Sequence, residues 1–282
     1  MKIQSKSIIA QFVFCSLLLI CSDIRAVDRI ELPDGVYYNR FASTVSGPEA
    51  VWINPAAIGY FNTITVQWSA EAFSGHFARN WGLTTTGEGI GLSLRQFDDS
   101  RGEEYKEYIF GASKQLGYGF FIGGSYRYFK DGSSDYIRKH FWDIGFLLKQ
   151  NPRLSLAAVL ANLNRSKIKG QRSDIEQRYS ASYAVYENIL EISTEASFST
   201  GQSLSDANYT YGIDFRPTHD LLTHANLDSD NNYEFGFRWD LKKYYVGFQT
   251  RFGDGDVHRG TSIIFGFIPE LGKARGQGRG NR

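Results

Sequence analysis

The sequence predicts an all-β fold, a transmembrane antiparallel β-barrel with fourteen strands. Two features of the chain lead to this prediction. Large apolar residues alternate with polar or small ones at period 2 from residue 62 onward, and the connections between the predicted strands alternate in length. Because pleating sends successive side chains of a strand to opposite faces, each strand has one apolar face and one polar face.

The composition fits this class and excludes others. Aromatic residues make up 15% of the 282 residues, and the chain has 29 Gly but only 6 Pro. Such a composition is unlike that of a helical membrane protein or a disordered chain. Lys and Arg number 31 and Asp and Glu number 30, so the chain lacks the basic surplus of a nucleic-acid-binding protein. No nucleic acid partner is expected.

Residues 1–26 are predicted to be a secretory signal peptide. A lysine-containing start precedes the apolar stretch 8–21, whose 14 residues are too few to span a bilayer as a helix. Cleavage is expected after Ala26. Lipidation of Cys21 is the alternative, but the residue before it is Ile20, where a lipidated cysteine normally has a small residue. Cleavage at Ala26 removes both cysteines, so no disulfide is expected in the mature chain.

Three segments show the alternation most clearly. The segments 209–216, 233–241 and 244–252 each have aromatic or aliphatic residues on one face and Gly, charged or amide residues on most of the other. A soluble β-sandwich also alternates. The aromatic-rich apolar faces favour the girdles of a membrane barrel, however, and Gly mixed with charge on the opposite face favours a crowded polar lumen.

The strand count supports a closed barrel. The connections after odd strands tend to be longer and polar, while those after even strands are short, apart from a short link at Ser74–Gly75 after the first strand. Long extracellular loops and short periplasmic turns are typical of bacterial barrels, and this order places both chain ends in the periplasm. The predicted strands are 62–73, 76–86, 88–97, 105–115, 117–130, 137–149, 152–163, 176–187, 188–199, 207–216, 218–227, 231–241, 242–252 and 259–267.

Two segments lie outside the predicted barrel of residues 62–267. Residues 27–61 precede the first strand and are predicted to be an N-terminal periplasmic segment. Residues 268–282 form a basic, Gly-rich tail that is expected in the periplasm. A solvated tail is the simpler interpretation, and contact with peptidoglycan or anionic lipid is the alternative.

Residues 47–59, with the sequence GPEAVWINPAAIG, resemble the N-terminal signature of the FadL-like and PorV-like outer-membrane barrels. In that family a stretch ending in Asn-Pro-Ala leads into the first strand, and Asn54, Pro55 and Ala56 match it. Residues 142–163 and 212–217 resemble the family's strand–turn–strand unit with its turn proline. The resemblance implies a fourteen-stranded barrel in which residues 27–61 fold inward as a hatch, with Asn54, Pro55 and Ala56 as the gating residues.

The sequence departs from the family pattern in three ways. The glycine-rich run before the signature is reduced to residues 46–48, and the loops are too short for a large extracellular vestibule. In addition, residues 268–282 follow Phe267, where such barrels often end. These departures concern ligand transport and leave the predicted barrel unchanged.

No catalytic or metal-binding constellation is found. Residues 228–232 start like a calcium loop, but the sixth position is Tyr233 and the twelfth is Trp239, so the EF-hand pattern fails. His258 near Asp254 and Asp256 is the one candidate for a rim-located enzyme site, and no nucleophile accompanies it. No enzymatic activity, cofactor or bound metal is therefore expected.

Charged residues of both signs occupy the polar faces of the later strands and are expected to face the lumen. They could pair across neighbouring strands, or they could line a permeation path. These residues are Glu191, Glu195, Asp214, Arg216, Glu234, Arg238, Asp240 and Arg251.

The sequence therefore leads to two functional hypotheses for a multi-pass barrel of the bacterial outer membrane. The first is passive transport of a hydrophobic small molecule such as a fatty acid, admitted when the hatch around Asn54, Pro55 and Ala56 shifts. The alternative is a PorV-like barrel that does not transport but acts as scaffold or shuttle for a secretion-system or envelope protein. Outer-membrane lipid is the expected partner in either case.

Overall fold

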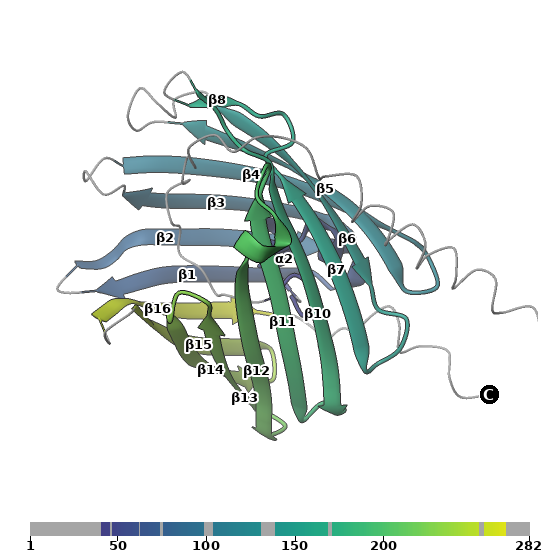
Figure 1. Cartoon of the computed structure of the whole chain (residues 1–282). Coiled ribbons are helices and arrows are strands. Elements are labelled where there is room, and N and C mark those ends of the chain that lie inside the picture. The colour runs from purple at the N-terminus through teal and green to yellow at the C-terminus, as the bar shows by residue number, and fades with distance from the viewer. Residues whose placement is uncertain are drawn as a thin grey trace, which may run out of the picture.

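The protein folds as a closed, fourteen-stranded antiparallel β-barrel (Figure 1). The computed structural model describes residues 41–45, 47–61, 63–73, 76–98, 104–130, 139–168, 171–253 and 257–268. β1 pairs with β16 and closes the barrel, which confirms the predicted fold and number of strands. The barrel strands are β1 (Thr65–Phe73), β2 (His76–Gly87), β3 (Ile90–Asp98), β4 (Glu104–Gly117), β5 (Phe120–Lys130), β6 (His140–Leu148), β7 (Leu154–Ala161), β10 (Glu176–Tyr186), β11 (Leu190–Ser199), β12 (Asn208–Thr218), β13 (Leu221–Asp228), β14 (Tyr233–Leu241), β15 (Tyr244–Gly253) and β16 (Val257–Phe267).

The two ends of the barrel differ in their connections. Short turns join β2 to β3, β4 to β5, β6 to β7, β10 to β11, β12 to β13 and β14 to β15, and we call this the short-turn end. Several of these turns contain a residue with positive φ, such as Glu88 (52°), Tyr118 (50°) and Lys242 (55°), which is the conformation that tight hairpin turns require. The opposite end, where the other connections lie, is called the long-loop end.

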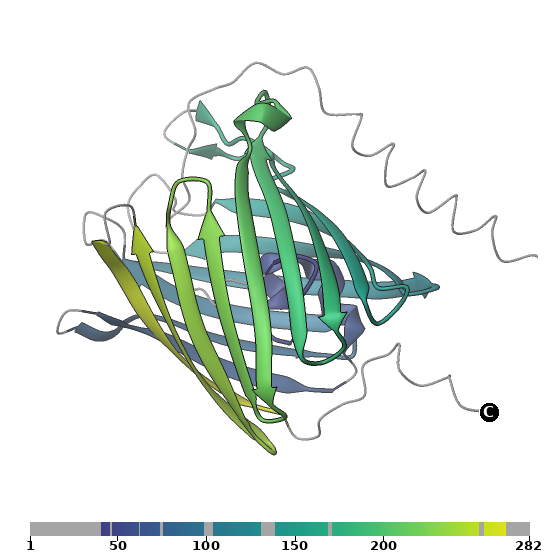
Figure 2. The same cartoon turned by 60° about the horizontal axis from the view of Figure 1, so that its bottom comes forward.

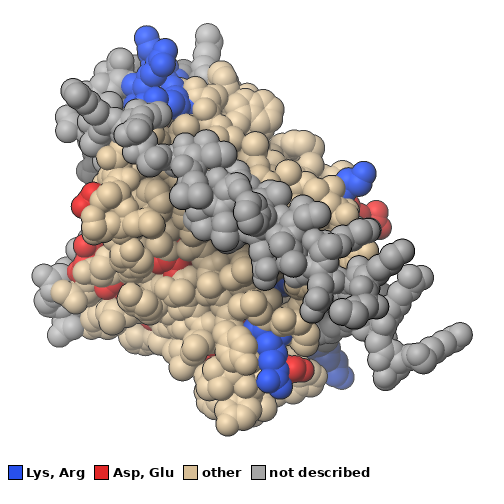
Figure 3. Space-filling view, turned by 45° about the vertical axis from the view of Figure 1, so that its right-hand side comes forward, with Lys and Arg blue, Asp and Glu red and all other residues tan. Residues whose placement is uncertain are grey.

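The alternation in sequence becomes an alternation between the outer face and the lumen. On β14, Phe235, Phe237 and Trp239 are exposed on the outer face, whereas Glu234 and Gly236 are buried inside. On the face shown in Figure 3, uncharged residues cover most of the visible wall and charged residues gather near its margins. An apolar band with charges at its edges is the surface that a membrane-spanning barrel needs.

The long-loop end contains local structure that the sequence did not predict. The connection from β7 to β10 carries a two-stranded sheet of β8 (Lys167–Ile168) and β9 (Gln171–Arg172), and the connection from β11 to β12 carries the 3₁₀ helix η2 (Leu204–Asp206). In the loop after β13, the Asp228 carboxylate accepts the backbone N–H groups of Asp230 and Asn232, each at 2.9 Å. Asp228 thus folds its own loop, which explains the calcium-like spacing without a metal.

A short helical segment lies inside the barrel (Figure 2). It contains α2 (Ala50–Ile53) and the 3₁₀ helix η1 (Pro55–Tyr60), and residues 41–45 precede it along the lumen wall. We call residues 41–45 and 47–60 the inserted segment. The predicted signal peptide, residues 27–40 and the tail beyond residue 268 lie outside the described residues. No described helix is long and apolar enough to cross a membrane.

Candidate functional site

The inserted segment is hydrogen-bonded to several strands of the barrel. On one side, the Trp52 indole donates to Ser93 Oγ on β3 at 2.7 Å, and Ser113 Oγ on β4 donates to the Ala56 carbonyl at 2.7 Å. On the other side, Glu195 Oε2 on β11 accepts the Ala42 N–H at 2.9 Å. The segment therefore spans the lumen between opposite parts of the wall.

The predicted gating residues lie at the centre of the segment. Asn54 is fully buried and donates through Nδ2 to the carbonyl oxygens of Ala42 (2.9 Å) and of Phe146 on β6 (3.2 Å). Its Oδ1 accepts the Ala56 N–H at 3.0 Å, so Asn54 is the N-cap of η1, with Pro55 at the first helical position. Asn54 thus joins both parts of the inserted segment to the wall.

Glycines on the lumen face of β3 to β6 form a cradle for the segment. A Cβ on Gly145 would overlap Asn54 Oδ1, and a Cβ on Gly123 would overlap the Pro55 carbonyl. Gly111 and Gly91 make the same kind of space for the Ile58 and Val51 side chains. The close approach of two backbones is a known reason for glycine inside a strand.

Apolar packing completes the contact between segment and wall. Val51, Ile53 and Ile58 of the segment are at most 6% exposed, and they share a buried cluster with lumen-facing residues that include Phe121 and Leu147. Each such side chain stabilises the packed state by about 1.5–3 kcal/mol relative to exposure. The segment is therefore a packed part of the barrel interior.

A buried row of alternating charges crosses β3 to β6 on the lumen side. Arg95 pairs with Glu107, and Arg127 Nε lies 2.8 Å from Asp143 Oδ2 and Nη1 lies 3.8 Å from Glu107 Oε1. The Arg95 guanidinium also lies 5.2 Å from the centre of the Trp52 ring, in a cation–π contact. We call these four residues, Arg95, Glu107, Arg127 and Asp143, the charge ladder.

The sequence did not nominate the charge ladder, although the period-2 alternation already assigns all four residues to one face. The signal was hidden because the same face of these strands carries large aromatics. Phe97, Tyr105, Phe129 and Phe141 form a buried cluster next to the ladder, toward the long-loop end.

The eight predicted lumen-facing charges all lie on β11 to β15. Glu234 is buried and lies 3.4 Å from Arg251 Nε and 3.7 Å from His224 Nε2. Asp240 bridges Arg216 (3.4 Å) and Arg238 (2.9 Å). Within each of these two groups, the side chains pair with one another across or along the strands. Two other members serve different contacts: Glu195 binds the inserted segment, and Glu191 lies directly opposite Asp214 in the β11–β12 register.

A line of partly exposed, mostly polar residues follows β11 and β12 through the lumen. On β12 the lumen-facing residues from Asn208 to Arg216 are all partly exposed, and on β11 so are those from Glu191 to Ser197. In contrast, Glu234 on β14 and Gln249 on β15, which also face the lumen, are 4% and 3% exposed. The strands β11 and β12 therefore carry the accessible side of the lumen.

Two aromatic residues of the inserted segment lie beside this line. The Phe41 ring occupies the space that the missing side chain of Gly212 on β12 leaves open. Tyr60 lies near the short-turn end, where Lys149 Nζ is 4.6 Å from its ring centre. Burial, and secondarily the nearby Glu191 carboxylate, raise the pKa of the Tyr60 phenol. Phe41 and Tyr60 thus narrow the accessible side from within.

The described residues show no group of three or more His, Cys, Asp or Glu that could hold a metal ion. His258 Nε2 lies 2.9 Å from Thr261 Oγ1 and 3.2 Å from Thr250 Oγ1, while Asp254 and Asp256, its nominated partners, lie outside the described residues. The predicted strand 218–227 starts too early. β12 extends to Thr218 and β13 begins only at Leu221, so His219 lies in the turn between them.

Comparisons with known proteins support the fold. The outer membrane protein Omp33 of Acinetobacter baumannii has a similar structure, with a TM-score of 0.50 and 12% identity over 74% of this chain and 99% of that chain. A mutant Rh. blastica porin (TM-score 0.44, 10% identity, 73% and 99% covered) and the KdgM porin (0.39, 9%, 72% and 96%) are more distant. No family model matches the chain, and no curated protein matches it. The chain therefore has the fold of an outer-membrane β-barrel, and membership of the FadL-like or PorV-like family stays a prediction.

Proposed function

We propose that the protein is a passive channel of the bacterial outer membrane, through which small solutes cross beside the inserted segment. The observation that carries the proposal is the line of partly exposed, mostly polar residues on β11 and β12, which extends from the long-loop end to the short-turn end. A closed barrel with an apolar outer wall and a polar interior is suited to this role. We place the short-turn end toward the periplasm, as is typical of bacterial barrels.

The inserted segment favours a path beside it over the opening of a hatch. Moving the whole segment would expose Val51, Ile53 and Ile58, at about 1.5–3 kcal/mol each, and would break the hydrogen bonds of Asn54. Widening the path beside β12 needs a smaller change, such as a shift of the Phe41 ring, which lies against Gly212. We therefore assign the gating role to Phe41 and keep the shift of Asn54, Pro55 and Ala56 as the rival hypothesis.

The lining of the path favours hydrophilic solutes. Toward the short-turn end the path is lined by Glu191, Asp214 and Arg216, and toward the long-loop end it is lined by Ser197 and Asn208. A fatty acid would have to pass charged groups of both signs without an apolar surface to replace water along its chain. Transport of a hydrophobic molecule and a PorV-like scaffolding role are the two alternatives that the following experiment separates.

The test is single-channel conductance of the full-length protein in planar bilayers. Phe41→Ala is expected to raise the conductance several-fold because it removes the ring that packs against Gly212 on the accessible side. Phe110→Ala is the matched control, because this phenylalanine is 50% exposed on the outer face and does not border the lumen. Phe110→Ala should leave the conductance unchanged.

Three other outcomes would change the interpretation. A larger increase for Asn54→Ala than for Phe41→Ala would favour the hatch. Absence of conductance in all variants, combined with uptake of a labelled fatty acid into vesicles, would favour hydrophobic transport. Absence of both activities would leave the scaffold hypothesis.

A further inference from the structure

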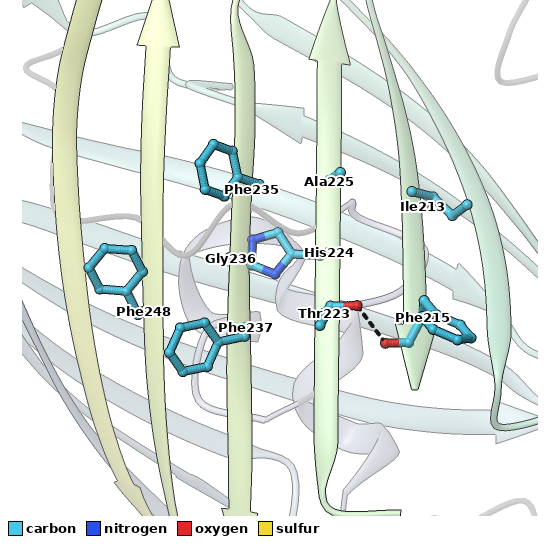
Figure 4. Close-up of a pocket in the computed structure, with 9 residues that line it drawn as sticks. All are labelled: Ile213, Phe215, Thr223, His224, Ala225, Phe235, Gly236, Phe237 and Phe248. Carbon is cyan, nitrogen blue, oxygen red and sulfur yellow. Dashed lines mark hydrogen bonds between the residues drawn. The ribbon is translucent and has the colours of Figure 1, made fainter. Parts of the chain in front are cut away.

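The outer wall has an apolar depression centred on β13 (Figure 4). Its volume is about 410 Å³. The small side chains of Thr223 and Ala225 form its floor. The strand register places Ala225 between Ile213 and Phe235, and Thr223 between Phe215 and Phe237. Small residues on one strand between large residues on both neighbours therefore create the depression.

The depression presents hydrocarbon and has no free polar group at its floor. Thr223 Oγ1 donates to the Phe215 carbonyl at 3.0 Å, which satisfies the hydroxyl. Behind the wall, the His224 ring packs across Gly236 and fills the lumen side at this height, so the depression is backed by packed side chains. Such a site suits an apolar chain, because any polar ligand group would lose its hydrogen bonds there.

Two lysines lie below the depression, in the turn between β14 and β15 at the short-turn end. Lys242 and Lys243 are both exposed. Five residue steps separate Phe237 at the depression from Lys242, which is roughly 16 Å along a strand at ~3.3 Å per residue and about 13 Å along the membrane normal for a strand tilted by roughly 40°. Half of a bilayer's hydrocarbon core is about 15 Å. A lipid whose phosphate lies at the lysines thus has its acyl chain at the height of the depression.

The wall between the two features is suited to the same lipid. Trp239 and Tyr244 are 56% and 48% exposed between the depression and the lysines. Trp and Tyr are typical of the membrane–water interface, where the headgroup and upper acyl chain of a lipid lie. Lysines near that surface attract anionic lipids.

We propose that the depression and the Lys242–Lys243 turn form a binding site for one anionic glycerophospholipid of the leaflet on the short-turn side. An acyl chain fills the depression over Thr223 and Ala225, and the phosphate and anionic headgroup contact the lysines. This site is on the lipid-facing wall and does not depend on transport through the lumen.

The test is native mass spectrometry of the full-length barrel after detergent delipidation and titration with phosphatidylglycerol. The wild-type barrel is expected to bind one molecule at low lipid concentration. Ala225→Phe fills the depression and should weaken that first binding step at least tenfold. Ala181→Phe places the same ring on the outer face of β10 and is the matched control, which should bind as the wild type does.

A second variant tests the headgroup and does not touch the wall. Lys242→Gln combined with Lys243→Gln should weaken phosphatidylglycerol binding roughly 30-fold, since each lysine near a membrane surface contributes about 1 kcal/mol. Binding of phosphatidylcholine should change little. Two outcomes would overturn the proposal. One is equal phosphatidylglycerol binding by the wild type, by Ala225→Phe and by the double lysine variant. The other is a wild-type barrel that binds phosphatidylcholine as tightly as phosphatidylglycerol.

Discussion

The wall formed by β3 to β6 and the wall formed by β11 to β14 face the same lumen with differently placed charges. In the first wall, the paired side chains of Arg95 and Glu107 are 5% and 0% exposed. In the second, the paired side chains of Arg216 and Asp240 are 29% and 19% exposed. The first wall buries its ion pairs between an aromatic cluster and the inserted segment, whereas the second buries Glu234 but keeps the Arg216–Asp240 pair in contact with the lumen. Burial therefore separates a structural row of charges from one that can meet a solute.

Glycine, in contrast, has the same role in both walls. In the first wall, any side chain at Gly123 or Gly145 would overlap the backbone or side chain of the inserted segment. In the second, a Cβ on Gly212 would overlap the Phe41 ring, whereas on the neighbouring strand β15 a Cβ on Gly247 would meet its nearest atom, the Phe237 carbonyl oxygen, at an ordinary 3.4 Å. Lumen-facing glycine thus allows close packing of the inserted segment on both walls, and Gly247 is a position with room for a methyl group.

The largest expected effect comes from removing one charge of the buried ladder. Glu107→Gln keeps the size of the side chain but leaves the Arg95 guanidinium buried without its carboxylate partner. Breaking a buried pair in this way costs about 3–5 kcal/mol. The measurement is the free energy of unfolding in urea, followed by the shift of the folded band on unboiled gels.

The counterpart on the other wall is Asp240→Asn, which removes the carboxylate between Arg216 and Arg238. Water can reach these side chains, so the expected loss is about 1 kcal/mol or less. Equal losses for Glu107→Gln and Asp240→Asn would show that the two walls do not differ in the way that their burial indicates.

A smaller effect is expected from adding one methyl group at a lumen-facing glycine, once on β6 in the first wall and once on β15. Gly145→Ala forces a Cβ against Asn54 and Pro55, and overpacking of this kind costs about 1–3 kcal/mol. Gly247→Ala meets only ordinary contacts and should stay within about 0.5 kcal/mol of the wild type. Protease accessibility of residues 47–60 in the folded barrel gives a second measurement, which should increase for Gly145→Ala alone.

The barrel itself could be predicted because its signal is local. Alternation within β12 or β14 assigns each side chain to a face without knowledge of any other strand, and the turns separate the strands clearly. The glycine cradle could not be predicted, because Gly145 is matched to Asn54, a residue 91 positions earlier in the chain. Alternation shows that Gly145 faces the lumen but does not show which residue fills the space above it.

The candidate path was predicted in part, for a related reason. The charges on β11 to β15 were visible because their strands have apolar outer faces and polar inner faces. Their separation into buried and accessible groups depends on neighbours in space: Glu234 is covered, while Asp214 on β12 is not. Phe41 gave no signal at all, since an isolated phenylalanine before the Asn-Pro-Ala motif carries no periodic pattern.

The smallest effect on stability, but a measurable one on function, is expected from the accessible charges of β12. Asp214 and Arg216 are two residues apart on the same face of one strand, and both are partly exposed. Asp214→Asn and Arg216→Gln should each change the free energy of unfolding by about 1 kcal/mol or less.

The charges of Asp214 and Arg216 act on passing ions at distances shorter than the Debye length of about 10 Å at 0.1 M salt. In a salt gradient, Asp214→Asn should therefore shift the reversal potential toward anion selectivity and Arg216→Gln toward cation selectivity. Each variant is the control for the other, because a general distortion of the barrel would shift both in one direction. Unchanged reversal potentials in both variants would exclude the β11–β12 side of the lumen as the conducting path.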